Sequence, residues 1–121
     1  MRRMNVQAVV RKKLAEALAG VEVRTSVPAD RPEKLVVVRR EGGAAQNQLL
    51  DAPGIGVDVW APSEAEACEL CMLAADEIMS LTFAEGFALV TEEVMASQYD
   101  QLTDSPHWYA SYSLITYKPI E

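Results

Sequence analysis

The sequence predicts an α+β fold, with a mostly antiparallel sheet of about five strands and two helices packed on one face. Two segments repeat apolar residues at helical spacing, and five others are alternating or β-branched, as strands are. They follow one another in the order α-β-β-β-α-β-β, and consecutive strands joined by short loops favour antiparallel pairing. At 121 residues, 50% of them hydrophobic, the chain is expected to form a single domain over residues 1–121.

The first predicted helix spans residues 5–19. Its apolar residues recur every four positions, at Val6, Val10, Leu14 and Leu18. Gly20 is a natural stop for this helix. Arg11, Lys12 and Lys13 fall off the apolar stripe, so the neighbouring face of the helix is expected to be strongly basic.

Three strand-like segments follow the first helix. Residues 21–25 alternate, as a half-buried strand does, and residues 34–40 are apolar on both faces, which indicates a central strand. Residues 55–60 alternate again. Between the last two, residues 41–48 are small and polar, which predicts a flexible loop that contributes nothing to the core.

The second helix has the clearest start signal in the chain. Ser63-Glu64-Ala65-Glu66 is a capping box, in which Ser63 caps the helix and Glu66 is expected to reach back to the Ser63 amide. Glu64, Glu66 and Glu69 crowd the positive end of the helix dipole. The apolar stripe is wide for a helix on a sheet, so we expect part of it to meet another subunit.

Two further strands are predicted towards the end of the chain. Residues 87–99 are strand-like with one interruption at Glu92-Glu93. Residues 108–117 alternate, and residues 100–106 between the two strands form a polar loop. Trp60 and Trp108 are either core residues or interface anchors.

No residue pattern indicates catalysis, a metal or a cofactor, so we expect no enzyme. Cys68 and Cys71 match C-x-x-C, but His107 is the only further soft ligand, one short of a zinc site. The two cysteines also lie more than a turn inside the helix, away from the N-terminus that activates a redox thiol. Asp104, Ser105 and His107 are too close in sequence to converge as a triad. No apolar run approaches the ~20 residues that span a bilayer, so no membrane partner is expected.

The distribution of charge is the most informative feature. Residues 1–40 carry ten Lys and Arg against four acids, whereas residues 41–117 carry thirteen acids and no Lys or Arg. The acidic stretch cannot hold phosphate, because nucleic-acid affinity comes mostly from Lys and Arg. It is either a solubilising surface, or a surface that docks a basic partner or lets DNA pass without binding. The basic N-terminal helix has no aromatic residues for base stacking, which favours a solvated or partner-facing helix side over nucleic-acid binding.

Opposite charges on two parts of one chain suit a head-to-tail contact between identical copies. In such a contact one patch meets a different patch on the next copy, and the assembly closes into a ring if the rotation allows it. A two-fold dimer gains less, because each patch could meet its own kind. The charge pattern therefore favours a ring.

Three segments carry a resemblance to a known family. They are Lys34 to Gly43 (KLVVVRREGG), Asp51 to Ala61 (DAPGIGVDVWA) and the capped helix start Ser63 to Ala67 (SEAEA). Together with the order and length of the remaining elements, they resemble tail terminator proteins of long-tailed, siphovirus-like bacteriophages. In that group a strand ending in Arg precedes a glycine turn and a long loop. A strand ending in an aromatic residue and Ala then leads into a Ser- or Thr-capped helix.

The resemblance implies a virion structural protein at the tail-head junction, assembled in the host bacterial cytoplasm. Its copies would form a hexameric ring that caps the tail tube, stops polymerisation of the major tail tube protein and offers the docking surface for the head-tail connector or neck protein. DNA would pass through the centre without specific binding, which an acidic lumen permits. A neck or head-completion (head-tail joining) ring protein, or a small cellular module with an acidic face, are the alternatives.

Two groups of residues are candidates for contacts in such an assembly. We expect the subunit interface to use Arg11, Lys12, Arg39, Arg40, Glu64, Glu66 and Glu69, with the two adjacent arginines meeting acids of a neighbour. The loop that contains Gly42, Gly43, Gln46 and Asn47 is expected to become ordered on contact with the tube or the connector.

Overall fold

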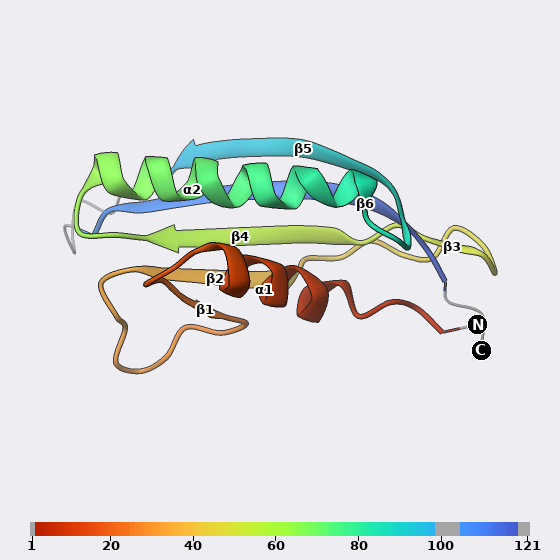
Figure 1. Ribbon diagram of the computed structural model, residues 1–121, viewed down its shortest axis with the longest axis horizontal. Coiled ribbons are helices and arrows are strands. Elements are labelled where there is room, and N and C mark those ends of the chain that lie inside the picture. The colour runs from red at the N-terminus through yellow and green to blue at the C-terminus, as the bar shows by residue number, and fades with distance from the viewer. Residues whose placement is uncertain (1, 99–104, 119–121) are drawn as a thin grey trace.

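The computed structural model describes residues 2–98 and 105–118. Its elements in chain order are α1 (Val6–Ala17), β1 (Glu22–Arg24), β2 (Leu35–Arg40), β3 (Leu50–Asp51), β4 (Gly54–Trp60), α2 (Glu64–Met79), the 3-10 helix η1 (Ser80–Phe83), β5 (Phe87–Ser97) and β6 (His107–Tyr117). Figure 1 shows two layers, with both helices on the same face of one sheet. The predicted α+β fold is confirmed.

The sheet is antiparallel except at one edge. Its strands lie in the order β1, β2, β4, β6 and β5. The short β3 pairs with Thr116 and Tyr117 at the C-terminal end of β6, past the residues that pair with β4. Among the described strands, β1 and β2 form the one parallel pair. About five strands were predicted and the described part of the chain contains six, because the two-residue β3 is too short to show a sequence period.

The first helix is fixed at both ends by local interactions. Asn5 caps it, since its side chain accepts a hydrogen bond from the Ala8 amide at 3.2 Å. The residues at the predicted four-residue spacing are buried. The helix ends at Ala17, two residues before the predicted end, and Gly20 with φ 76° then turns the chain towards β1.

The second helix begins where the capping box predicts. The Ser63 hydroxyl accepts a hydrogen bond from the Glu66 amide at 3.2 Å and donates one to the Glu66 carboxylate at 3.0 Å. The expected bond from the Ser63 amide to Glu66 is therefore replaced by a bond between the two side chains. Glu64 and Glu66 lie in the first turn, near the positive end of the helix dipole.

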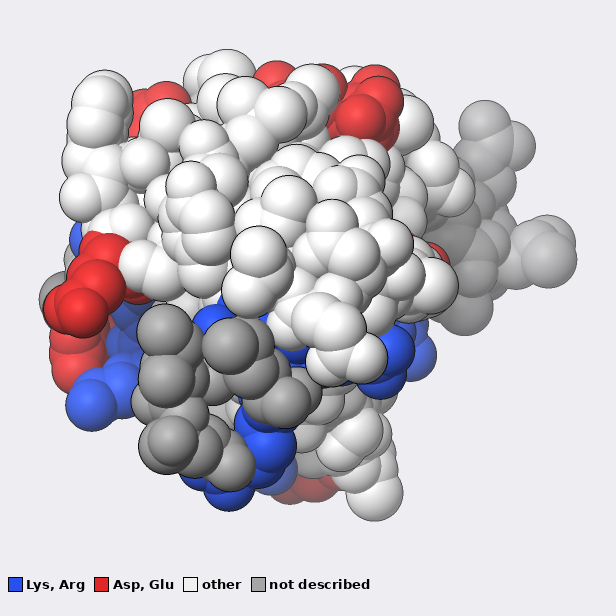
Figure 2. All heavy atoms as spheres, turned by 90° about the vertical axis from the view of Figure 1, so that its right-hand side faces the viewer, with Lys and Arg blue, Asp and Glu red and all other residues white. Residues whose placement is uncertain are grey.

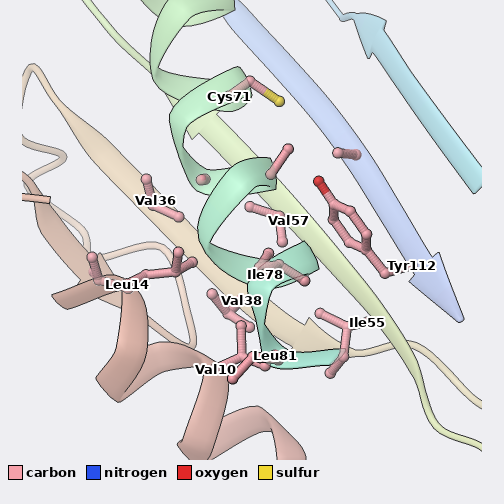
Figure 3. Packing of buried hydrophobic residues seen from close by; sticks show 14 of the residues in the cluster. Val10, Leu14, Val36, Val38, Ile55, Val57, Cys71, Ile78, Leu81 and Tyr112 are labelled. Atoms are coloured by element: carbon pink, nitrogen blue, oxygen red, sulfur yellow. The ribbon is translucent and has the colours of Figure 1, made fainter. Parts of the chain in front are cut away.

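The core lies between the two helices and one face of the sheet. Figure 3 shows the side chains of α1 and α2 meeting those of the central strands. The labelled members of this cluster are Val10, Leu14, Val36, Val38, Ile55, Val57, Cys71, Ile78, Leu81 and Tyr112. Burying each large apolar side chain contributes about 1.5–3 kcal/mol, so this cluster is the main stabilising feature of the fold.

Strand β2 is buried on both of its faces, as predicted for a central strand. All four residues from Leu35 to Val38 are fully buried. Val36 and Val38 belong to the core cluster under the helices, whereas Leu35 and Val37 alternate to the other face.

Strand β5 contains the interruption that the sequence shows. Its register with β6 shifts between Glu92 and Val94, so Glu93 is the extra residue of a β-bulge. The alternation predicted for β6 is confirmed, since Ala110, Tyr112 and Leu114 face the core. Tyr99 and most of the predicted polar loop, residues 100–104, lie outside the described residues.

Within residues 2–98 and 105–118, no helix has the length and apolar character needed to cross a bilayer. The same residues contain no group of three or more His, Cys, Asp or Glu side chains arranged to hold a metal ion.

Candidate assembly surfaces

The charged side chains fall into two halves of the molecule. Among the described residues, every Lys and Arg except Lys118 belongs to residues 2–40, which contain α1, β1 and β2. Helix α2 and strand β5 together carry seven acids and no Lys or Arg. Because α1 packs beside β1 and β2 whereas α2 packs on β4, β5 and β6, the division along the chain becomes a division in space.

Figure 2 shows this division at one end of the molecule. Lys and Arg side chains gather in its lower half, acids lie along its upper edge, and the two signs adjoin at the left. Four acids also lie within the basic half, at Glu16, Glu22, Asp30 and Glu33. The two halves therefore differ in the sign of their net charge, although the basic half also contains these individual acids.

Arg40 organises the segment that follows β2. Its guanidinium binds Asp51 through two hydrogen bonds of 2.8 and 3.2 Å. It also donates to the carbonyl oxygens of Gly42 at 3.2 Å and Gly43 at 3.1 Å. Asp51 is fully buried, and Arg3 approaches the same carboxylate at 3.6 Å. Hydrogen bonding from Arg40 lowers the pKa of Asp51 and outweighs burial, which raises it.

The candidate contact loop has a defined conformation in the isolated subunit. The Asn47 side chain accepts hydrogen bonds from the Leu49 and Leu50 amides at 2.8 and 3.0 Å. The Gln46 amide donates to the Leu50 carbonyl oxygen at 3.0 Å, and Ala45 forms an isolated bridge with Asp51. The loop residues predicted to become ordered on contact thus already form a turn, held at its base by Arg40.

Arg39 also binds an acid of its own subunit. It donates to Asp58 at 3.2 Å, on the sheet face opposite to the helices. The other Asp58 oxygen lies 2.7 Å from the His107 ring nitrogen. This group was not predicted from the sequence, although strand alternation places Asp58 and Trp60 on one face of β4.

Trp60 completes the same group. Its ring stacks on the His107 ring at 4.4 Å between centroids, and the Arg31 guanidinium lies 5.3 Å from its centroid. Trp60 is half-buried on the face opposite to the core, whereas the half-buried Trp108 packs against the core cluster. The two tryptophans therefore have different environments.

A second polar contact covers the middle of this sheet face. The Tyr109 hydroxyl donates a hydrogen bond to the Glu41 carboxylate. Gly56 makes room for it, because a Cβ at that position would overlap the carboxylate. Burial and this hydrogen bond raise the pKa of Tyr109 to about 12.

The three candidate acids of α2 lie at its N-terminal end. Glu64 accepts hydrogen bonds from the Trp108 indole at 2.9 Å and the Ser97 hydroxyl at 2.6 Å. Glu66 binds Ser63, and Glu69 is exposed. Within one subunit these acids are not brought to Arg39 or Arg40, whose guanidinium groups bind Asp58 and Asp51.

Arg11 and Lys12 lie on α1, at the basic side of the molecule. Arg11 donates to the Val23 carbonyl oxygen at 3.0 Å, so it joins α1 to β1. Lys12 is exposed, and the next residue, Lys13, forms an ion pair of 3.6 Å with Glu77 of α2. The interface roles of Arg11 and Lys12 stay predictions.

The fold has a counterpart among solved structures. A chain described as "Virion of native gene transfer agent (GTA) particle" is similar to this one, with a TM-score of 0.71. The similarity covers 93% of this chain and 94% of that chain, at 13% sequence identity. At that identity it establishes a shared fold over nearly the whole length. No protein-family model matches the chain, and no curated protein sequence matches it.

The cysteine pair lies in the apolar part of α2. Cys71 is buried in the core cluster, whereas Cys68 is half-buried, and both are free thiols. Burial is the main reason why the pKa of Cys71 is raised to about 12. A thiol in that state is a weak nucleophile, and it fits a packing role.

Proposed function

We propose that this chain is a virion structural protein, a tail terminator of a long-tailed phage-like particle. The observation that carries the proposal is the shared fold with a virion chain over 93% of the sequence. The resemblance of residues 34–43, 51–61 and 63–67 to tail terminators supports the same role. In this proposal the chain has no catalytic activity and needs no cofactor.

Copies of the chain form a ring around the DNA path. The separation of a basic half from an acidic half supports this arrangement, since a head-to-tail contact joins unlike surfaces and can close into a ring. The ring is hexameric, stops growth of the tail tube and provides the surface for the head-tail connector. An acidic lumen lets DNA pass, because it offers no cations to the phosphates.

The turn at Gly42, Gly43, Gln46 and Asn47 is the contact with the tube or connector in this proposal. Its preformed shape supports the role, since a loop held by Arg40 and Asn47 loses less conformational entropy on binding than a free loop does. Arg39 and Arg40 bind Asp58 and Asp51 within the subunit. At a ring contact they would bind an acid of the neighbour in addition to these partners or in place of them.

The test is negative-stain microscopy of particles assembled without the gene for this chain. Tails of uncontrolled, excessive length are the expected result. Tails of normal length on heads that leak DNA would contradict the tail terminator role and favour the neck or head-completion ring. Particles indistinguishable from wild type would favour a cellular binding module.

A further inference from the structure

One long edge of the sheet has no partner strand among residues 2–98 and 105–118. Strand β5 spans eleven residues and pairs with β6 along one side. Along its other side, no described residue pairs with it. Leu89 and Val94 on this strand are 51% and 45% exposed. An edge strand of this length with exposed apolar residues is a ready site for another protein surface.

The acids in the middle of β5 determine which surface it can accept. Glu92 is tied to its own subunit, since it accepts a hydrogen bond from the Tyr112 hydroxyl at 3.3 Å. Glu93 is the bulged residue, and it is exposed. If two β5 edges paired about their midpoints, the acids of both copies would lie opposite each other. Like charges directly opposite each other are destabilising, so a two-fold dimer through β5 is disfavoured.

The opposite edge of the same sheet offers a basic counterpart. Beside β1 lies an open hollow of about 550 Å³ whose lining includes Arg11, Ala15, Val23 and Arg24. Glu22 shares this lining and pairs with Arg24 at 2.9 Å. The surrounding half of the molecule carries an excess of Lys and Arg. A carboxylate that enters the hollow therefore meets the guanidinium groups of Arg11 and Arg24 and one acid, Glu22, and the net charge around it is positive.

We propose that β5 of one subunit docks on the β1 edge of a second copy, with Glu93 entering the hollow that Arg11 and Arg24 line. The proposal rests on the ring proposed above and names the two surfaces that meet in it. The contact is head to tail, because β5 and β1 are the opposite edges of one sheet. The α2 acids stay outside it.

The test is a charge exchange within the full-length protein, followed by sedimentation velocity at low salt. Glu93→Arg and Arg24→Glu are each expected to weaken self-association at least tenfold. The double variant Glu93→Arg/Arg24→Glu is expected to recover association to within about threefold of wild type, since the exchanged charges meet again across the contact. Both residues are exposed, so the thermal unfolding midpoints should stay close to that of wild type.

Asp76→Arg is the matched control, because it reverses an exposed acid of α2 that is not among the expected interface residues, and it is expected to leave association unchanged. Wild-type rings with no effect of Glu93→Arg, or a double variant as weak as the single variants, would overturn the docking proposal and leave the ring intact. Loss of association in Asp76→Arg alone would move the contact to α2 and overturn the docking proposal as well. Wild-type protein that never self-associates would overturn the ring and this contact together.

Discussion

The half-buried Arg40 and the buried Asp51 form an ion pair through two hydrogen bonds, and the pair closes the segment between β2 and β4. The carboxylate is fully buried, and the same guanidinium holds the carbonyl oxygens of Gly42 and Gly43. A planar guanidinium suits this arrangement because it can donate in several directions at once. The candidate contact loop is therefore shaped by a pair that lies beneath it.

Replacing Asp51 by Asn should destabilise the protein. The substitution removes a charged acceptor from Arg40, and a hydrogen bond to a charged group makes a net contribution of about 1.5–3 kcal/mol to stability. We expect a loss of about 1–3 kcal/mol in the free energy of unfolding, measured by urea denaturation. Asp30→Asn is the control, since it changes an exposed acid and should alter stability by less than about 0.5 kcal/mol.

The same pair predicts a pH dependence. The native pKa of Asp51 is lowered, so its stabilising contribution is fully present above the unfolded pKa of about 3.9 and is lost as the pH falls through the native pKa. Wild-type stability should therefore fall more steeply than that of Asp51→Asn below about pH 4. Parallel stability curves for the two proteins would show that Arg40 does not lower the pKa of Asp51.

Two neighbouring glycines should respond differently to alanine. Both have positive φ angles, 103° at Gly42 and 79° at Gly43, so both substitutions introduce about 1–2 kcal/mol of backbone strain. A Cβ at Gly43 would also overlap the Ala52 carbonyl oxygen, whereas one at Gly42 meets nothing within 4 Å. Gly43→Ala should thus be clearly more destabilising in thermal unfolding. Equal effects would contradict the described turn.

Glu41→Gln should lower the pKa of Tyr109. Burial is the larger cause of its value of about 12, and the hydrogen bond to the Glu41 carboxylate is the next. Removing the negative charge of Glu41 takes away its Coulombic effect and weakens the hydrogen bond but leaves burial, so the pKa of Tyr109 should fall but stay above the ordinary value of about 10. Ultraviolet titration checks this, with Tyr109→Phe in each background identifying the signal. An unchanged value would place Glu41 away from the hydroxyl.

The two cysteines should differ in reactivity towards a disulfide reagent at neutral pH. Cys68 is half-buried and should react in the native protein, whereas Cys71 is buried with a raised pKa and should react only on unfolding. Cys68→Ser should remove the fast phase and leave the slow one. Two fast thiols would mean that the core around α2 opens easily.

The sequence predicted the elements whose periodicity is strong. The predicted ends of α1, based on the spacing of Val6, Val10 and Leu14, agree with the observed ends to within two residues. The capping box at Ser63 predicted where α2 begins. The apolar run from Leu35 to Val38 identified a strand buried on both faces. These patterns are local, so a single sequence contains them.

The contacts of the charged residues were not predictable in the same way. Arg39 and Arg40 were expected to meet a neighbouring subunit, and they bind acids of their own chain, nineteen and eleven residues away respectively. These pairs depend on strand register and on β3, which leaves no period in the sequence. The group of Asp58, His107 and Trp60 likewise forms only when β4 pairs with β6.

Native mass spectrometry of the purified wild-type protein, recorded from low to high salt, shows directly whether the subunits close into a ring. We expect a closed ring of six identical copies at low salt that dissociates as salt screens the contact between the basic and acidic halves. A two-fold dimer as the largest species, or a monomer under every condition, would contradict it.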